Sequence, residues 1–498
     1  MELGLQFEDV ICCEMTTGVT TAREETLETA IPDYCPDVAR IVDTVGWLMI
    51  REKRWSEERF TLSGSVKTTV LYTSGEATGL RSLTISVPFT WALEGQSLTG
   101  CETICAEGRV LLAEARAVTS RKLYIKVLPE VTLTGFRRRK YRLCRALQGE
   151  PTVRQKGCTL ELPLLAAAAE KTFSLAQEVV PEQTAAPEEL LLHRLCPAVL
   201  SVQRLGGKLM VKGELWFHVL CRGEDQSLQQ YDGAVPFSQI LDVAELPEEA
   251  EYTLCLGISQ GDVRIVRTDS GCGFGLTAHM DACIQAWQRR SITCVADVYS
   301  TRFDAMVQRQ ELTIPQLSPA RSVQEEAQLR LEPEGAQPFI AVTAVDCGAP
   351  EVLPEEQGVS LRTTLHVHLL YLDSDGAPVS TERTVEVCAA GGAGELASAS
   401  CGRAALSFSG GACQVRLPVT FSLRCAGEQA VSAITAVTLS ESQREKGPSL
   451  ILCRLGQGET LWDLAKRYQT DEEAIRSANQ LESDEDAEKY MLLIPKIR

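Results

Sequence analysis

A strand-like pattern that recurs about every 150 residues is the sequence feature that most limits how this chain can fold. Residues 60–72 alternate, so that Leu62, Gly64, Val66, Thr68, Val70 and Tyr72 share one face of an expected strand. The same phase returns 149 positions after Val66 at Leu215, and 150 positions later at Leu365. An internal period of this length predicts a chain built from three copies of one unit.

The flanks of the recurring strand support the repeat. Val87-Pro-Phe89 follows the first copy, Val235-Pro-Phe237 follows the second, and residues 385–387 take this place in the third. Upstream, Ile31-Pro-Asp33 and Val180-Pro-Glu182 lie at matching distances from the first two copies. We therefore expect an N-terminal segment at 1–21, repeats at 22–156, 171–314 and 321–445, and a separate module at 448–498.

The repeats predict a mainly β fold. Short alternating runs are separated by turn-rich stretches such as Thr73-Ser-Gly75 and Asp373-Ser-Asp-Gly376, which favours antiparallel sheets arranged as sandwiches or distorted barrels. A short helix is expected near 36–44 or 187–195. Linkers are expected at 150–156, 315–321 and 440–448, and the third repeat is degenerate around 389–400.

The last fifty residues predict a small α+β module with the order strand, helix, helix, strand. Leu450–Cys453 is a short apolar strand, and Thr460 with Asp463 three residues on is typical of a capping box. A second helix is expected to open at Thr470, with Ile475 and Ala478 facing inward. Leu492–Pro495 closes the module as a strand.

These residues resemble the LysM family. The resemblance rests on Gly458–Leu461, Trp462–Ala465, Tyr468, Asn479 and Leu493–Pro495. It implies a shallow groove for N-acetylglucosamine polymers between two loops. The candidate binding residues are Gly458, Glu459, Thr460, Leu461, Trp462, Asn479, Gln480 and Leu481. Trp462 and Leu461 are the expected anchors, since an aromatic side chain at a small groove often dominates binding energy; core packing is the alternative for both.

The module departs from the usual family pattern at two places. Glu459 stands where the family has aspartate, and Ala487–Tyr490 replaces a Pro-Gly turn. An acidic cluster, consisting of Glu482, Asp484, Glu485, Asp486 and Glu488, lies beside the groove. Such a run is either a solvated face or a contact for a basic protein partner.

Taken together, the repeats and the module resemble the SipL-like family of spore coat morphogenetic proteins, whose repeats are called SPOCS domains. The residues that carry this resemblance are Ile31–Val42, the strand ending at Val70-Leu-Tyr72, and Val87–Phe89. It implies a non-enzymatic adaptor in the mother-cell cytoplasm, at the forespore surface or spore coat. The implied partners are a stage IV sporulation protein A-like coat ATPase polymer and other coat proteins. The alternative is a protein that binds the peptidoglycan chains of the spore cortex or cell wall.

The amino-acid composition limits the classes of partner and the location that we expect for this protein. With 67 acidic and 49 basic residues, the formal charge of −18 argues against nucleic-acid binding. No run approaches the roughly 18–20 apolar residues that span a bilayer, and the first residues lack a signal-peptide pattern, so we expect a protein that is cytoplasmic and not transmembrane. The 19 cysteines are scattered and are expected to be mostly reduced, with later oxidative cross-linking as the alternative.

Motifs for catalysis and metal binding are missing from the sequence, so neither an enzyme, a cofactor nor a metal site is expected. Gly271–Gly275 matches half of a dinucleotide fingerprint but predicts only a turn or bulge. His366 and His368, like His218, are expected to face solvent. The basic run Arg137–Lys140, with Arg142 and Arg145, is either a linker or strand end, or a docking site for an acidic partner or an anionic membrane.

Overall fold

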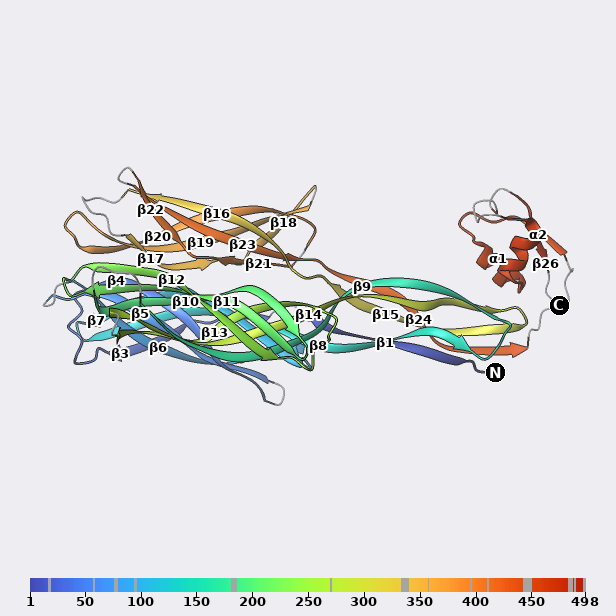
Figure 1. Ribbon diagram of the computed structural model, residues 1–498, viewed down its shortest axis with the longest axis horizontal. Coiled ribbons are helices and arrows are strands. Elements are labelled where there is room, and N and C mark those ends of the chain that lie inside the picture. Colours follow the sequence, from blue (N-terminus) through green and yellow to red (C-terminus); the bar gives the residue numbers. More distant parts are fainter. Residues whose placement is uncertain are drawn as a thin grey trace.

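The computed structural model describes the chain except residues 17–18, 57–58, 76–78, 94–95, 181–185, 269–270, 333–339, 357, 395, 410–411, 442–449, 482–486, 488–489 and 496–498. Antiparallel strands dominate the described chain, as the sequence predicted. Strand pairing groups them into three units, which we call unit 1 (residues 1–148), unit 2 (153–300) and unit 3 (303–441). A small module at 450–495 follows (Figure 1).

Unit 1 contains β1 (Gly4–Met15), β2 (Val19–Ala22), β3 (Glu25–Ala30), β4 (Arg40–Ser56), β5 (Arg59–Thr73), β6 (Leu80–Leu93), the 3-10 turn η1 (Gln96–Leu98), β7 (Thr103–Thr119) and β8 (Lys122–Gln148). Unit 2 contains β9 (Val153–Val179), β10 (Pro187–Leu205), β11 (Lys208–Gly223), β12 (Leu228–Asp242), β13 (Glu251–Thr268) and β14 (Gly271–Ser300).

Unit 3 contains β15 (Phe303–Leu317), β16 (Arg321–Leu331), β17 (Ile340–Cys347), β18 (Glu351–Glu355), β19 (Gly358–Leu372), β20 (Pro378–Gly391), β21 (Leu396–Cys401), β22 (Ala405–Ser409), β23 (Ala412–Arg424) and β24 (Ala426–Glu441). The module contains β25 (Leu450–Cys453), α1 (Leu461–Tyr468), α2 (Glu472–Asn479) and β26 (Leu492–Pro495).

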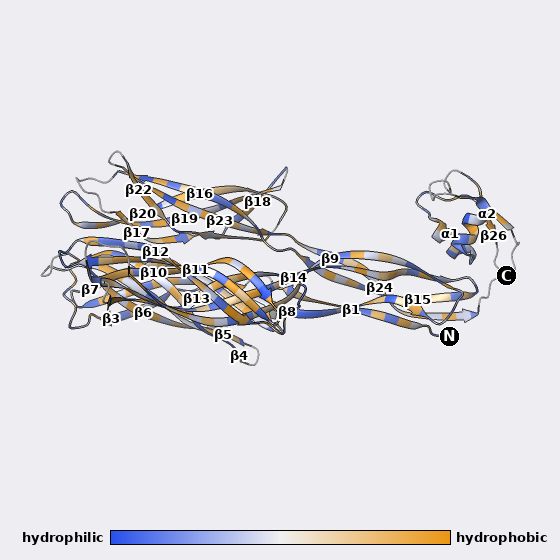
Figure 2. Ribbon diagram, in the orientation of Figure 1, coloured by the Kyte–Doolittle hydropathy of each residue, from blue (hydrophilic) through white to orange (hydrophobic). Residues whose placement is uncertain are grey.

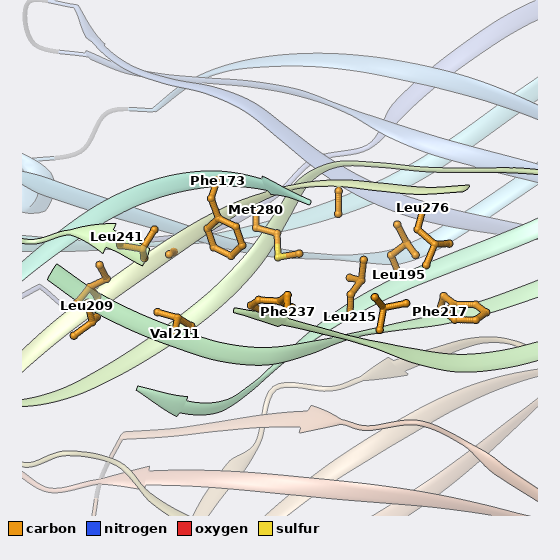
Figure 3. Close-up of a cluster of buried hydrophobic side chains, with 14 of the residues drawn as sticks. Phe173, Leu195, Leu209, Val211, Leu215, Phe217, Phe237, Leu241, Leu276 and Met280 are labelled. Atoms are coloured by element: carbon orange, nitrogen blue, oxygen red, sulfur yellow. The ribbon is translucent and has the colours of Figure 1, made fainter. Parts of the chain in front are cut away.

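Each unit is a sandwich of two antiparallel layers. In unit 2, one layer has the order β10-β11-β12 and the other the order β13-β14-β9. Apolar side chains from both layers meet between them, among them Leu215 and Phe237 from the first layer and Leu276 and Met280 from the second (Figure 3). Period-2 alternation along each strand therefore buries one face of each layer.

The repeated sequence positions occupy equivalent places in the sandwiches. Gly64 on β5 pairs with Phe89 on β6, and Gly213 on β11 pairs with Phe237 on β12. A Cβ atom added to Gly64 or Gly213 would lie 2.7 or 2.5 Å from the facing phenyl ring. Glycine is needed at both positions because the phenyl ring of the neighbouring strand packs directly over the glycine Cα. This packing explains why a Val-Pro-Phe segment accompanies the glycine in both copies.

The three units pack around one apolar axis. Leu71, Leu220 and Leu370, which the repeat places at equivalent positions, are each 0% exposed and belong to one cluster. Val42, Leu191 and Ala341, a second equivalent set, join the same cluster. The face of each central strand that the sequence assigned to solvent therefore faces the other units.

The three units also share a stalk, which we define as the paired segments β1 with 136–148 of β8, 153–165 of β9 with 287–300 of β14, and β15 with β24. Each unit contributes one two-stranded ribbon. The ribbons bury a common core that includes Val10, Leu143, Leu162, Ile292, Ile314 and Val431. The stalk extends away from the sandwiches, and the module lies beside its tip (Figure 1). Apolar and polar residues alternate along the strands of the stalk (Figure 2).

Several local predictions were wrong. The expected helices at 36–44 and 187–195 are absent from these described residues, where β4 begins at Arg40 and β10 at Pro187, because both strands pair with the central strand of their unit. The expected linkers at 150–156 and 315–321 instead contain the ends of β9, β15 and β16. The repeat boundaries stay a prediction, although β1, placed in the 1–21 segment, pairs with β8 of unit 1.

The histidines and the basic run also differ from expectation. The Nδ1 of His368 donates to the Asp43 carboxylate of unit 1 at 3.4 Å, and His218 pairs with Asp232 at 2.8 Å, so neither side chain simply faces solvent. Arg137–Lys140 lies inside β8, where Glu14 of β1 pairs with Arg139 and Asp9 pairs with Lys140. The acidic residues of β1 therefore balance much of this positive charge.

The part of the chain that the structure describes has no helix with the length and apolar character needed to cross a bilayer.

Candidate functional site

The first helix of the C-terminal module begins as the sequence predicts. Thr460 is the N-cap of α1: its hydroxyl accepts from the backbone N–H of Asp463, and the Asp463 carboxylate accepts from the backbone N–H of Thr460 at 2.9 Å. Hydrogen bonds from Thr460 hold the pKa of Asp463 below its ordinary value. This reciprocal pair satisfies backbone donors that a helix start leaves unpaired.

The second helix begins one residue later than predicted. Asp471, not Thr470, is the N-cap of α2, and Thr470 is fully buried. The Thr470 hydroxyl donates to the carbonyl of Pro495 on β26, so this side chain joins the helices to the closing strand. Both helices end at a glutamine in the left-handed region, Gln469 with φ 53° and Gln480 with φ 51°.

The module has its own apolar core. Leu461, Leu464, Ala465, Ile475, Leu492 and Ile494 are all buried in one cluster. Ala478, which the sequence placed inward, is exposed. Leu461 is 3% exposed, so the core-packing alternative describes its position in this structure.

The predicted groove residues divide into structural and exposed side chains. Glu459 accepts a hydrogen bond from the backbone N–H of Gly456 at 2.9 Å and pairs with Arg467. Asn479 donates to the carbonyl of Leu493 and accepts from its N–H, both at 2.7 Å, which joins α2 to β26. Gly458, Thr460 and Gln480 are exposed, whereas Leu481 packs against the module core.

Trp462 contacts the stalk. The Trp462 indole Nε1 donates to the Asp297 carboxylate at 2.9 Å, and its ring meets Tyr299 edge-on with centroids 4.7 Å apart. Asp297 and Tyr299 both lie near the end of β14. Trp462 is 8% exposed, so the side chain predicted as a ligand anchor is covered by unit 2.

Further polar contacts hold the module on the stalk tip. Lys466 of α1 donates to Asp297 at 2.6 Å, and Arg154 of β9 donates to Asp471 at 2.6 Å. The Gln469 amide donates to the carbonyl of Phe303 at 3.2 Å. We call this set of contacts the dock: Trp462, Lys466, Gln469 and Asp471 on the module, and Arg154, Asp297, Tyr299 and Phe303 on the stalk.

The dock contains ionised groups. Burial alone would raise the pKa of Asp297, but hydrogen bonds from Lys466 and Trp462 outweigh it and hold this pKa below its ordinary value. The hydrogen bond from Arg154 likewise lowers the pKa of Asp471. Burial raises the pKa of Tyr299 to about 12. Both dock carboxylates are therefore charged at neutral pH.

The order β25-α1-α2-β26, the capping box at Thr460 and the loop at Gly458 match one known domain type. Residues 454–485 match the LysM domain family model. A LysM domain suggests binding of peptidoglycan or related glycans. No curated protein matches the chain. The acidic cluster between Glu482 and Glu488, predicted beside the groove, lies outside the described residues.

The stalk side of the dock was not predicted from the sequence. Arg154, Asp297 and Tyr299 are distant from the LysM module along the chain, and no local motif marks them. The one available signal was Trp462, an aromatic residue on a short amphipathic helix whose polar edge needs a partner when buried. That signal predicts a covered surface but not what covers it.

Proposed function

We propose that this chain is a non-enzymatic adaptor of the spore envelope. In this proposal the three sandwiches form the scaffold, and the LysM module presents a binding surface at the stalk tip. The partner is a stage IV sporulation protein A-like coat ATPase polymer at the forespore surface, on the mother-cell side, and other coat proteins contact the sandwiches.

The dock is the observation that carries this proposal. It uses one face of α1 and the start of α2, whereas Gly458, Thr460 and Gln480 remain exposed in the docked module. A module fixed in this way presents the same loops at a constant distance from the scaffold. Such a placement suits a protein that links two layers, because a fixed module loses little conformational freedom on binding.

The LysM match supports a second candidate, the binding of peptidoglycan chains of the cortex or cell wall. The same exposed loops would then contact N-acetylglucosamine units. The formal charge of −18 favours a basic protein partner over this glycan, because a neutral sugar gains nothing from charge complementarity. A basic protein surface would gain from it.

Co-sedimentation of the full chain with filaments of the coat ATPase, and separately with purified peptidoglycan, tests both candidates. The adaptor proposal expects the chain to sediment with the filaments and to stay in solution with peptidoglycan. Sedimentation with peptidoglycan alone would overturn it in favour of the glycan candidate. Sedimentation with neither would contradict both.

Two glutamines provide a matched pair of variants for this experiment. Gln480 and Gln469 both end a helix in the left-handed region, where glycine is readily accommodated. Gln480→Gly removes an exposed side chain at the predicted groove, and we expect about 2- to 10-fold weaker partner binding, the worth of one net hydrogen bond. Gln469→Gly removes a dock contact instead and should leave binding at the groove within twofold.

A further inference from the structure

Two cysteines face each other inside the stalk. Cys158 on β9 and Cys294 on β14 are directly paired residues, and their Sγ atoms lie 3.3 Å apart. Directly opposed residues of antiparallel strands have Cα atoms roughly 4.5 or 5.5 Å apart, and both values fall within the roughly 4.4–6.8 Å that a disulfide spans. A bond between these sulfurs therefore requires only a small movement of the side chains.

A cavity beside the pair provides room for a small reagent. It has a volume of about 180 Å³ and is lined by Cys158, Cys294 and Cys144, together with apolar residues such as Leu160 and Val431. A water molecule occupies roughly 30 Å³ of liquid. Hydrogen peroxide, which is only slightly larger than water, can therefore fit next to both thiols.

We propose that Cys158 and Cys294 form an oxidation site of the stalk, at which a hydroperoxide converts the two thiols into a disulfide between β9 and β14.

The difference in exposure between the two cysteines assigns their roles. Cys158 is half-buried, whereas Cys294 is 4% exposed. Burial and the neighbouring Cys158 raise the pKa of Cys294, which disfavours its thiolate. Cys158 is therefore the thiol that meets the oxidant first, and Cys294 is the resolving thiol.

The chemistry balances with one hydroperoxide per disulfide. The Cys158 thiolate attacks one peroxide oxygen, the O–O bond breaks, and the leaving hydroxide takes the proton that Cys158 released, giving a sulfenic acid and water. The Cys294 sulfur then attacks the Cys158 sulfur, and the S–O bond breaks. The hydroxide that leaves takes the Cys294 proton, so two thiols and one hydrogen peroxide yield one disulfide and two waters.

The position of this pair connects it to two other features of β14. Cys283, earlier on the same strand, is in a disulfide with Cys105 of β7, so β14 is already linked covalently to unit 1. Asp297 of the dock lies three positions after Cys294, just past a register shift between Val295 and Asp297. A second disulfide at Cys294 would fix the end of β14 to β9 immediately before the dock.

Peptide mapping of the full-length protein tests the proposal. Purified protein is titrated with hydrogen peroxide, remaining thiols are alkylated in denaturant, and the chain is cleaved with trypsin without reduction. Cys158 lies alone in peptide 157–171 and Cys294 alone in peptide 291–302, so their disulfide gives a single linked peptide pair.

We expect this linked pair to form before the buried reference thiols Cys221 and Cys413 lose alkylation, and dithiothreitol to reverse it. Recovery of both peptides fully alkylated, at a dose that already oxidises the reference thiols, would overturn the proposal. So would a disulfide from Cys144 to either residue in place of the expected link.

Two variants separate the pair from its neighbour in the cavity. Cys158→Ala removes the first thiol and should abolish the linked peptide, with Cys294 remaining alkylated. Cys144→Ala keeps both reacting thiols and should leave link formation within twofold of the wild-type chain. If either variant does not fold, the mapping of the wild-type protein decides the question alone.

Discussion

The unit axis and the dock are two internal interfaces of the same chain that use opposite chemistry. The axis joins the sandwiches through equivalent leucines, Leu71, Leu220 and Leu370, which are each 0% exposed. The dock joins the LysM module to the stalk through carboxylates, a lysine and an arginine around one aromatic pair. Apolar burial is nearly insensitive to pH and salt, whereas ion pairs near the surface respond to both.

This difference indicates which part of the molecule can change. Separation of the units would expose apolar surface at roughly 25 cal/mol per Å². Release of the module exposes few apolar side chains besides Trp462 and Tyr299, and its polar groups regain water. We therefore expect the sandwiches and stalk to behave as one body and the dock to open first.

Substitution of an axis leucine should have the largest effect. Leu220→Ala should lower the free energy of unfolding by about 3 kcal/mol, because it leaves a cavity where three units meet. Leu71→Ala and Leu370→Ala should cost similar amounts, since the repeat makes the three positions equivalent. Urea unfolding followed by circular dichroism measures the loss.

The exposed Leu200, 65% accessible, provides the matched control for the axis. Leu200→Ala should change the unfolding free energy by less than about 0.5 kcal/mol. If Leu220→Ala were as mild as this control, the units would not be packed around the axis.

Loss of Asp297 should open the dock and spare the axis. Asp297→Ala removes the hydrogen-bond acceptor of Trp462 and Lys466. The docking free energy should fall by about 2–3 kcal/mol, because the Lys466 ammonium and the Trp462 indole both lose a partly buried, charged acceptor. Hydrogen exchange in α1 and at the end of β14 should accelerate, with no change in the sandwich strands.

Glu472→Ala is the control for the Asp297 variant, because it removes a carboxylate of α2 that pairs with Arg476 one turn along the same helix. Exchange at the end of β14 should then match the wild-type chain. Equal acceleration in both variants would mean that the module, rather than the dock, had been destabilised.

Besides the apolar axis, units 1 and 3 share a polar contact between Asp43 and His368, and this contact predicts a pH-dependent contribution to their interface. The hydrogen bond to Asp43 raises the pKa of His368 and outweighs its burial, with Glu382 and Asp346 adding negative charge nearby. A raised pKa means that this stabilisation is complete below about pH 6.5 and is lost as the pH rises through the folded-state pKa.

We expect the free energy of unfolding to fall by about 1 kcal/mol as the pH is raised through this range, in keeping with one hydrogen bond to a charged group. The Asp43→Asn variant, which keeps the shape of the side chain, should remove most of the dependence. A pH profile unchanged in Asp43→Asn would assign the effect to other groups.

The sequence predicted the β class and the LysM module well because both depend on local pattern. Alternation placed Val66, Leu215 and Leu365 correctly toward the sandwich cores, and Thr460 with Asp463 marked the start of α1. Period-2 alternation shows which side chains face away from the sandwich core. It does not show whether water or another unit covers that outward face. The sequence therefore placed His368 and the basic run of β8 on open surface. The family resemblance placed Trp462 in a groove. Partners distant in sequence cover all three.

Substitution of Lys466 should have the smallest effect on docking. The dependence of docking on salt concentration then distinguishes the polar dock from the apolar axis. The Lys466 ammonium pairs with Asp297, but its side chain is 44% exposed, so Lys466→Gln should weaken docking by only about 0.5 kcal/mol. Raising the ionic strength from about 0.05 to 0.5 M should weaken docking in the wild-type chain, because the Debye length falls well below its value of about 10 Å at 0.1 M. The same change should weaken docking less in the Lys466→Gln variant, which lacks this ion pair. Hydrogen exchange in α1 at both salt concentrations measures this difference. The axis should show no such loss, because leucines carry no charge to screen. Equal salt sensitivity of the dock and the axis would contradict the division between a polar and an apolar interface.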